Sequence, residues 1–558
     1  MGKGGRPTDP SDATHHARMH AMGLTAAQMA QPLVGVVTSW NEAAPANMAL
    51  ARQAQAVKRG VRDAGGTPRE FNTIAAADGR GSDRTAPVAS LAHREVIADS
   101  VELMVRGHSH RALVGLAGCD MAMAAMMMAM ARLDIPSVVM FGGTALPGRY
   151  QDRDVTLQDV AEATGAHAAG HMDDTDFQTL VRNASPSAGA GAGHFNAHTM
   201  GCIAEALGLA LPGTASIPAP YDSRDDCGFA TGKAVMTLLQ DGIRPRDILT
   251  RAAFENGAAI LAATGGATNT VLHLLALAHE CGIEFDLDSV AATFRRTPLI
   301  ADLKPAGRYL AHDLHAAGGM PAVMRQLLDG GYLDGTCLTV TGRSMAENLQ
   351  DRPWAGDQDV ILPAGQPHAA ATSLVVLTGN LAPDGALAKA DGLPDRCMTG
   401  TARCFDCEAA GLAALERGDV GDGDVLVIRY QGPKGGPGMP AILDLPAALC
   451  GQGADGRIAV ITDGCLSGML RGPCVGHIGP EAALGGPIAM LRDGDRITID
   501  MAAGRIDMEV SDAELSARRK DWQPPPSPAL DGALWKYQQL VRPASQGAVT
   551  HSPASAPA

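Results

Sequence analysis

Short aliphatic segments alternate with longer, helix-length segments along the first part of the chain. The aliphatic runs predict strands, and the segments between them predict helices. The strands are expected at 33–39, 112–116 and 137–141, and the helices at 48–63, 95–107 and 121–133. A strand, a turn and a helix that repeat about every 30 residues are typical of parallel βαβ units. We therefore expect an α/β domain with a parallel sheet.

The pattern changes after about residue 365. Helical segments are expected before that point, at 199–209, 248–279 and 319–328; after it, short strands are expected at 372–377, 424–430, 457–462 and 496–500. Strands separated by glycine-rich turns favour a β-rich, barrel-like domain. We expect an N-terminal extension at 1–31, the α/β domain at 32–365, the β-rich domain at 366–545 and a disordered tail at 546–558.

Composition narrows the possible partners. The 558 residues carry a formal net charge of −15, which disfavours binding to nucleic acid or to an anionic membrane surface. The methionine-rich stretch at 112–133 is broken by Gly118 and contains Asp120 and Arg132, so we expect a buried strand and helix and no membrane span. The eleven cysteines and the absence of an apolar leader at the start predict a reduced, cytoplasmic protein.

Long stretches of the chain resemble the dihydroxy-acid dehydratase / phosphogluconate dehydratase family, from about Pro32 to Thr550. They include FNTIAAADG (71–79), HREVIADSVELMV (93–105), GCDMAMAAMMMAMARLDIPSVVMFGG (118–143), GGATNTVLHLLALA (265–278), DLKPAGRYLAHDLHAAGGMPAV (302–323), RYQGPKGGPGMP (429–440) and VGHIGPEAALGGPIAMLRDGDRITID (475–500). The resemblance implies a lyase that removes water from a small hydroxylated carboxylic acid. It also implies a site between the two domains and a homodimer or homotetramer.

Relatives hold an iron–sulfur cluster with three cysteines, and only one of these positions is kept. Cys119 matches the second cysteine, whereas Ala46 and Gly191 stand at the first and third positions. Because a two-iron cluster requires about four ligands, we expect that no 2Fe-2S cluster is bound. Cys404 and Cys407 have the spacing of metal ligands, but this spacing alone is weak evidence.

The magnesium ligands that the resemblance implies are partly kept. Asp78 and Asp120 match two carboxylates, Met121 replaces a lysine that relatives carbamylate, and Gln431 stands where a glutamate is expected. Mg²⁺ or another divalent cation therefore has fewer anionic ligands than in relatives, and we expect weak binding. In the alternative, both aspartates form hydrogen bonds to loop amides.

Two residues of the second domain match functional positions. Ser467, in DGCLSGM, matches the serine that relatives use as base. Lys434, in the GPKGG loop, is a candidate for holding a carboxylate. A serine without a nearby cation is a poor base at neutral pH, so a turn serine is the alternative.

His194 and His198 offer a replacement metal site. Four residues separate them, which places them on one face if they are helical. Together with Asp78 and Asp120 they would suit Zn²⁺ or Mn²⁺. Two surface or capping histidines are the alternative.

Three functions stay open. The first is a divergent dehydratase-family lyase acting on a dihydroxy- or sugar-acid-like carboxylate. The second is a cluster-free isomerase, hydrolase or C–C lyase that uses His194, His198, Arg84 and His93. The third is a non-catalytic regulatory paralogue. The glycine loop before the helix near 199 and the two aspartates predict a pocket for a small polar carboxylate.

Overall fold

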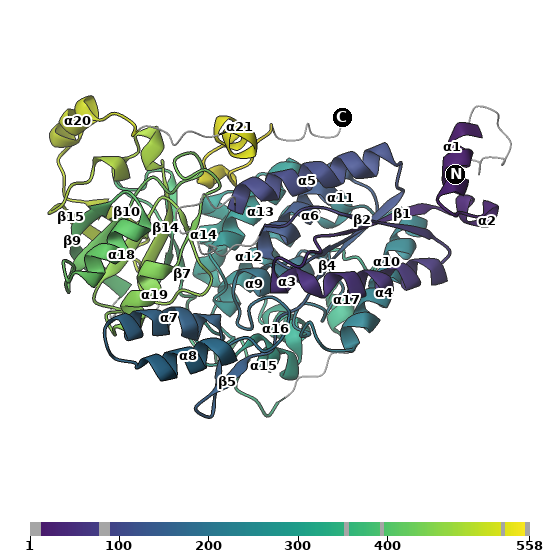
Figure 1. Ribbon diagram of the computed structural model, residues 1–558, viewed down its shortest axis with the longest axis horizontal. Coiled ribbons are helices and arrows are strands. Elements are labelled where there is room, and N and C mark those ends of the chain that lie inside the picture. The colour runs from purple at the N-terminus through teal and green to yellow at the C-terminus, as the bar shows by residue number, and fades with distance from the viewer. Residues whose placement is uncertain (1–12, 77–89, 351–355, 391–395, 526–530, 553–558) are drawn as a thin grey trace.

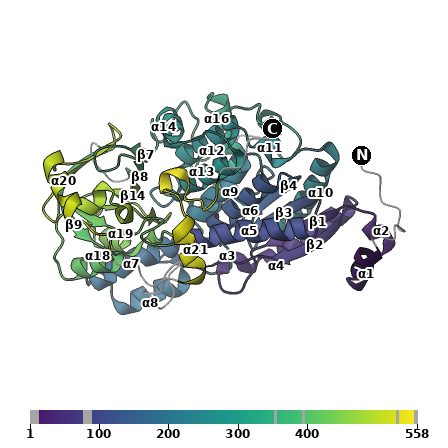
Figure 2. The same cartoon turned by 90° about the horizontal axis from the view of Figure 1, so that it is seen from above.

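The computed structural model describes residues 13–76, 90–350, 356–390, 396–525 and 531–552. An α/β part and a barrel-like part lie at opposite ends of the long axis (Figures 1 and 2). Both expected fold types are thus confirmed. The expected division near residue 365 remains a prediction.

The α/β part is built on a four-stranded sheet in which every neighbouring pair is parallel. Its order is β2–β1–β3–β4, with β2 at Thr67–Asn72, β1 at Leu33–Thr38, β3 at Ala112–Ala117 and β4 at Ser137–Phe141. The aliphatic pattern predicts β1, β3 and β4 because they are buried on both faces. It misses β2 (TPREFN), an edge strand that contains a proline and whose last four residues alternate between half-buried and exposed.

Helices cover both faces of this sheet. On one face, α4 (Leu50–Asp63) packs against α10 (Ser223–Asp241), and a side chain at Gly60 or Gly232 would collide with backbone of the other helix. On the other face, α5 (Ser90–Gly107) packs against α6 (Asp120–Leu133). The methionine-rich α6 is buried from its first residue to Ala131, as expected for a helix that is apolar all round.

Further helices extend this core. The segment expected at 199–209 is α9 (Asn196–Ala206), and the one expected at 248–279 is two helices, α12 (Arg251–Thr264) and α13 (Asn269–Cys281). Gly265, at a φ of 60°, ends α12 in the left-handed conformation that glycine permits. The others are α1 (Ala13–Ala21), α2 (Ala26–Met29), α3 (Pro45–Met48), α7 (Leu157–Ala168), α8 (Asp174–Asn183), α11 (Pro245–Ile248), α14 (Leu287–Arg296), α15 (Ala311–Ala316), α16 (Gly319–Asp329) and α17 (Met345–Leu349), with a small hairpin of β5 (Gly148–Tyr150) and β6 (Arg153–Val155).

The barrel-like part contains an eight-stranded mixed sheet. Its order is β16 (Arg505–Met508), β15 (Arg496–Asp500), β9 (Cys397–Phe405), β10 (Asp424–Ile428), β12 (Ala459–Thr462), β14 (Cys474–Gly479), β8 (Gly385–Lys389) and β7 (Leu374–Leu377). A bridge between Thr378 and Arg505 joins the two edges, so the sheet is nearly closed. Its remaining elements are α18 (Glu408–Glu416), β11 (Ala441–Ile442), α19 (Asp444–Gly451), β13 (Cys465–Leu466), α20 (Asp512–Asp521) and α21 (Gly532–Leu540).

Contacts at several places join the parts. Helix α19 of the barrel part packs against α7 of the α/β part, and Arg471 forms a two-pronged ion pair with Glu162, at 2.9 and 3.0 Å. The chain end then returns to α5 and α13 (Figures 1 and 2). There Ala548 and Val549 are fully buried in the hydrophobic core of the α/β part. The sequence predicts a disordered tail from 546, but residues 547–550 are packed. Within the described part of the chain, every helix is too short or too polar to span a bilayer.

Candidate functional site

A cavity of about 480 Å³ lies where the two parts meet. Side chains from both parts line it, among them Ala46, Cys119, Asp120, Gly191 and Asn196 from the α/β part and Glu408, Asp444 and Ser467 from the barrel part. A neighbouring cavity of about 300 Å³ shares Ala46, Cys119 and Gly191 with it. The three positions that the resemblance assigns to the cluster therefore lie together on one wall.

The sheet topology explains this location. Strands β1 and β3 are neighbours although β2 separates them in sequence, so the chain reverses its strand order between them. Parallel sheets bind ligands beyond the carboxyl ends of their strands at such a reversal. Ala46 follows β1, and Cys119 and Asp120 follow β3 directly. The sheet therefore presents both segments at one edge.

Asp120 is buried, with one carboxylate oxygen hydrogen-bonded and the other unpaired among the described residues. Its side chain is 1% exposed, and its Oδ2 lies 3.4 Å from Nε2 of His273 on α13. The other oxygen, Oδ1, has no hydrogen-bond partner among the described residues. Burial acts to raise the pKa of Asp120, but the His273 hydrogen bond and nearby backbone amides lower it below its ordinary value. The group is thus an anion with one oxygen left for a ligand.

Arg94 contacts the ring nitrogen of His273 that does not face Asp120. Its Nη1 lies 3.5 Å from Nδ1 of His273, and its guanidinium is fully buried. It also donates to the carboxylate of Glu95 at 2.8 and 2.9 Å, and to the carbonyls of Gly547 and Ala548 at 2.8 and 2.9 Å. The chain end thereby contacts the residues behind the cavity.

Ser467 comes from a turn of the barrel part that follows β13. It is 8% exposed, its backbone N–H donates to the carbonyl of Ile442 at 3.0 Å, and its Oγ accepts from the N–H of Met469 at 3.3 Å. A side chain at Gly468 would collide with Asn196 at the start of α9. Glycine there lets the Ser467 turn approach the wall of the α/β part closely.

Five helices of eight residues or more begin on the cavity wall. Their first residues line it: Asp120 of α6, Leu157 of α7, Asn196 of α9, Glu408 of α18 and Asp444 of α19. Helix starts carry partial positive charge and unpaired N–H groups. Acidic side chains stand in the first turn of four of these helices, α6, α7, α18 and α19, whereas the first turn of α9 has none. The cavity therefore offers a negative side at Asp120 and a positive side at α9, which suits an anion that also carries hydroxyl groups.

Glu408 and Asp444 line the cavity but are not among the residues that the sequence predicts for the site. Glu408 Oε1 accepts from the N–H groups of Leu443 and Leu445, at 2.8 and 3.1 Å, and so caps α19. Acidic residues in a first helical turn are a recognisable signal, but they indicate a cap and not a site. Only the fold brings these two carboxylates to the cavity.

Lys434 and Gln431 are not among the residues that line the cavity. The backbone N–H of Lys434 donates to both oxygens of Glu481, at 3.0 Å each. The amide nitrogen of Gln431 faces three backbone carbonyls, those of Asp406, Arg429 and Tyr430, at 3.1 to 3.2 Å. Both residues thus hold the glycine-rich loop in shape. Met121 is packed in the hydrophobic core.

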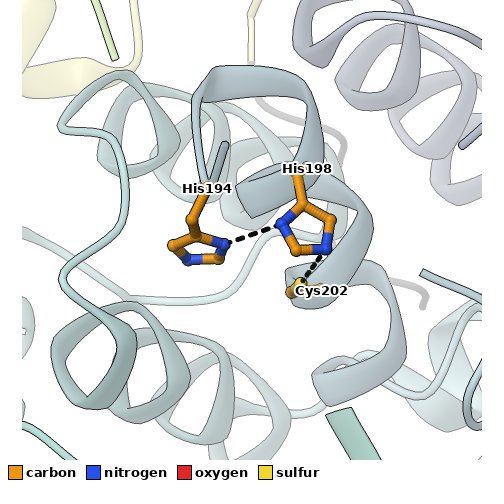
Figure 3. Close-up of side chains that lie close together, drawn as sticks. All are labelled: His194, His198 and Cys202. Carbon is orange, nitrogen blue, oxygen red and sulfur yellow. Dashed lines mark hydrogen bonds between the residues drawn. The ribbon is translucent and has the colours of Figure 1, made fainter. Parts of the chain in front are cut away.

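His194 and His198 form a buried chain of hydrogen bonds (Figure 3). The hydroxyl of Thr264 donates to the carbonyl of Ile260, so it accepts from Nε2–H of His194 at 2.9 Å. The Nδ1 of His194 then accepts from Nδ1–H of His198 at 3.0 Å, and Nε2 of His198 faces Cys202 Sγ at 3.7 Å. Every ring nitrogen is matched when both histidines are neutral. Burial lowers the pKa of both, that of His198 to about 3.

The remaining candidates lie elsewhere. Asp78 and Arg84 fall outside the described residues. His93 is buried near the start of α5 and is not among the residues that line the cavity. Burial raises the pKa of the Cys404 thiol to about 12, whereas Cys407 is exposed.

Comparison with known proteins agrees with this architecture. The model of the dihydroxy-acid/6-phosphogluconate dehydratase N-terminal domain matches residues 31–348, and that of the C-terminal domain matches residues 359–548. The chain is 56% identical to the dihydroxy-acid dehydratase of Parvibaculum lavamentivorans over 97% of this chain and 94% of that protein. It is 54% identical to dihydroxy-acid dehydratase 2 of Bradyrhizobium diazoefficiens over 97% of this chain and 94% of that protein. It is 45% identical to the dihydroxy-acid dehydratase of Sulfurisphaera tokodaii over 96% of each chain. The chain therefore belongs to the dihydroxy-acid/6-phosphogluconate dehydratase family, a family of lyases.

Proposed function

We propose that this chain removes water from a small 2,3-dihydroxy or sugar-type carboxylic acid and releases a 2-keto acid. The observation that carries the proposal is the buried Asp120, whose Oδ1 has no partner among the described residues, in a cavity that Ser467 lines from the other part. The names of the relatives, which are dihydroxy-acid dehydratases, support the substrate class.

The cavity residues divide the reaction between them. The N-terminal turn of α9 takes the substrate carboxylate, because its N–H groups and partial charge favour an anion. A base removes the proton at C2 while the C3–O bond breaks, and the electron pair of the C–H bond forms the C2–C3 double bond. The departing hydroxide and the proton taken from C2 leave together as one water. The enol becomes the 2-keto acid when a proton moves from its O2 hydroxyl to C3. A serine is a poor base at neutral pH without a nearby cation, so we assign Ser467 as the base for the cation-bound chain. We assign Asp120 as the group that orients the hydroxyls.

We further propose that the chain binds no 2Fe-2S cluster. Of the three positions, Ala46 and Gly191 carry no ligand atom, and only Cys119 offers a thiol. A Cβ at Gly191 would lie 2.8 Å from the ring of Phe195, so a ligand side chain there would require that ring to shift. These residues do not fit a cluster that needs about four ligands.

A divalent cation fits the cavity better than a cluster does. The Oδ1 atom of Asp120 is an available hard ligand for Mg²⁺ or Mn²⁺, and Asp78, which lies outside the described residues, is the second carboxylate that the resemblance implies. Such an ion would polarise the departing hydroxyl. Two carboxylates in place of about four anionic groups predict weak binding, because Met121 and the inward-turned Gln431 add no charge.

The His194–His198 pair is, in this proposal, part of the core and holds no ion. Its hydrogen bonds are complete without a metal. The positive charges of Arg224 and Lys389 lie near enough to lower the pKa values of these histidines. A further cation beside them would be repelled.

Turnover tests the proposal directly. The purified chain is incubated with glycerate, a branched 2,3-dihydroxy acid and 6-phosphogluconate, with and without Mg²⁺ or Mn²⁺, and products are identified by mass spectrometry. A 2-keto acid lighter than its substrate by one water supports dehydration. A product of unchanged mass would instead indicate an isomerase. No product under any condition would favour a non-catalytic paralogue.

We also propose that the chain forms a homodimer or homotetramer, as its family membership suggests. Light scattering on the purified chain tests this. A monomer at micromolar concentration would contradict it.

A further inference from the structure

We propose that His273 is the positioning residue for Asp120, and that Arg94 makes residues 547–550 of the chain end part of the active site. These residues are called the C-terminal clamp below. The inference rests on the proposed function in one respect only, which is that Asp120 acts on the substrate. The hydrogen-bond geometry stands without it.

The direction of each hydrogen bond follows from chemistry. A guanidinium only donates, so Nδ1 of His273 must accept from Arg94 at 3.5 Å. The proton of neutral His273 then sits on Nε2, which faces Oδ2 of Asp120 at 3.4 Å. Arg94 therefore selects the tautomer that can donate to Asp120. With Oδ2 engaged, the carboxylate is oriented so that the free Oδ1 is left for the ligand.

Arg94 in turn depends on the C-terminal clamp. Its side chain is 0% exposed, and a buried charge is tolerated only when its donors are satisfied. Two of its acceptors are the carbonyls of Gly547 and Ala548, and a third is Glu95. The second oxygen of Glu95 accepts from both the N–H and the hydroxyl of Thr550, at 3.3 and 3.0 Å. The clamp thus completes the partners of both Arg94 and Glu95.

The relay joins four distant segments at one point. Arg94 lies on α5, Asp120 begins α6, His273 lies on α13 and the clamp follows α21. In both views α5, α6 and α13 are adjacent (Figures 1 and 2). Correct placement of the Asp120 carboxylate therefore depends on a chain end that lies more than 400 residues later in the sequence. A packing role alone would require only the size of the His273 ring, whereas positioning requires its donor and its acceptor.

Two substitutions at one position separate these roles. His273→Gln keeps one donor and one acceptor, and His273→Phe keeps an aromatic ring without either. We expect kcat for the branched 2,3-dihydroxy acid to fall about 10- to 100-fold in His273→Phe, with KM changed less, and to recover largely in His273→Gln. His279→Gln is the control, because His279 lies on the same helix but contacts the carbonyl of His551. Equal losses in the Phe and Gln variants, or no loss in Phe, would overturn the proposal.

Truncation tests the clamp. A chain that ends after Gln546 lacks the clamp, whereas one that ends after Ser552 keeps it. We expect a loss of kcat like that of His273→Phe in the first and full activity in the second. Equal activity of the two truncated chains would overturn the role of the clamp. This pair also decides the question if His273→Phe does not fold.

A measurement without turnover separates this inference from the proposed function. Nitrogen-15 NMR of histidine-labelled protein, with His273 assigned by its loss in His273→Gln, reports the tautomer. We expect the Nε2–H form in the wild type and in the chain ending at Ser552, and a mixture in the chain ending at Gln546. An Nδ1–H form in the wild type would overturn the relay. Failure of all three acids to react would refute the function and leave this result intact.

Discussion

Two buried histidine networks of the α/β part end differently. The chain through His194 and His198 begins at Cys202 and ends at a backbone carbonyl, with every ring nitrogen matched. The chain through His273 begins at the C-terminal clamp and ends at Asp120, one of whose oxygens has no partner among the described residues. A closed network stabilises the core, whereas a network that ends in an unsatisfied group at a cavity identifies a site.

The networks also differ in charge. Burial keeps His194 and His198 neutral, and within the described part of the chain their ring nitrogens face only each other, Thr264 and Cys202. The second network contains an aspartate, an arginine and a glutamate, all nearly inaccessible to solvent. Charged groups are costly to bury, so their presence beside a cavity is better explained by function than by stability.

The largest effect on activity is expected when the carboxylate of Asp120, at the unpaired end of the second network, is removed. Asp120→Asn keeps the shape of the side chain but removes its charge, so activity should fall about 10²- to 10⁴-fold. The melting temperature should change little, because Oδ1 makes no hydrogen bond within the described residues. Kinetics and thermal melts of the same preparation check both. An unfolded variant whose surviving fraction is fully active would show that Asp120 is structural.

Breaking the network of His194 and His198 should lower stability and leave activity unchanged. His198→Phe leaves Nδ1 of His194 without its donor, so the free energy of unfolding should fall by about 1 to 3 kcal/mol. Turnover should be unchanged under conditions in which the variant is folded. Urea unfolding with and without Zn²⁺ measures this. Stoichiometric stabilisation of the wild type by Zn²⁺ that disappears in the variant would contradict the assignment to the core.

A third buried cluster, formed by Glu481 and Asp463 at the glycine-rich loop, should make the stability of the chain depend on pH. Burial and the neighbouring Asp463 raise the pKa of Glu481 to about 7, from 4.5. Between these values the folded chain binds more protons than the unfolded chain, so stability should fall as pH rises from about 4.5 to 7. Glu481→Gln should reduce the total change in the free energy of unfolding over this range by about 3 kcal/mol. Urea unfolding at several pH values provides the measurement, and equal slopes would contradict the raised pKa.

Local patterns predicted what local residues determine. Strands β1, β3 and β4 and helix α6 are apolar throughout, and their types were evident from sequence. The edge strand β2 and the break at Gly265 were not, because half-buried strands and helix ends carry weaker signals. The resemblance was enough to predict that Cys119, Asp120 and Ser467 belong to one site, and all three line one cavity.

Contacts between distant residues explain what sequence reasoning missed. His273 lies 153 positions from Asp120, and Gly547 lies 453 positions from Arg94, so no local spacing connects them. The spacing of His194 and His198 correctly indicated proximity, although His194 precedes α9 and does not belong to it. Proximity alone did not distinguish a ligand pair from a hydrogen-bonded one. That distinction required the positions of Thr264 and Cys202.

The central claim is that this family scaffold carries an Asp120-centred site without an iron–sulfur cluster. The most direct test is the iron and acid-labile sulfide content of protein purified without oxygen. We expect far less than one iron atom per chain and no absorption band between roughly 320 and 450 nm. Two iron and two sulfide per chain would contradict the account and would require cysteines other than Cys119 as ligands.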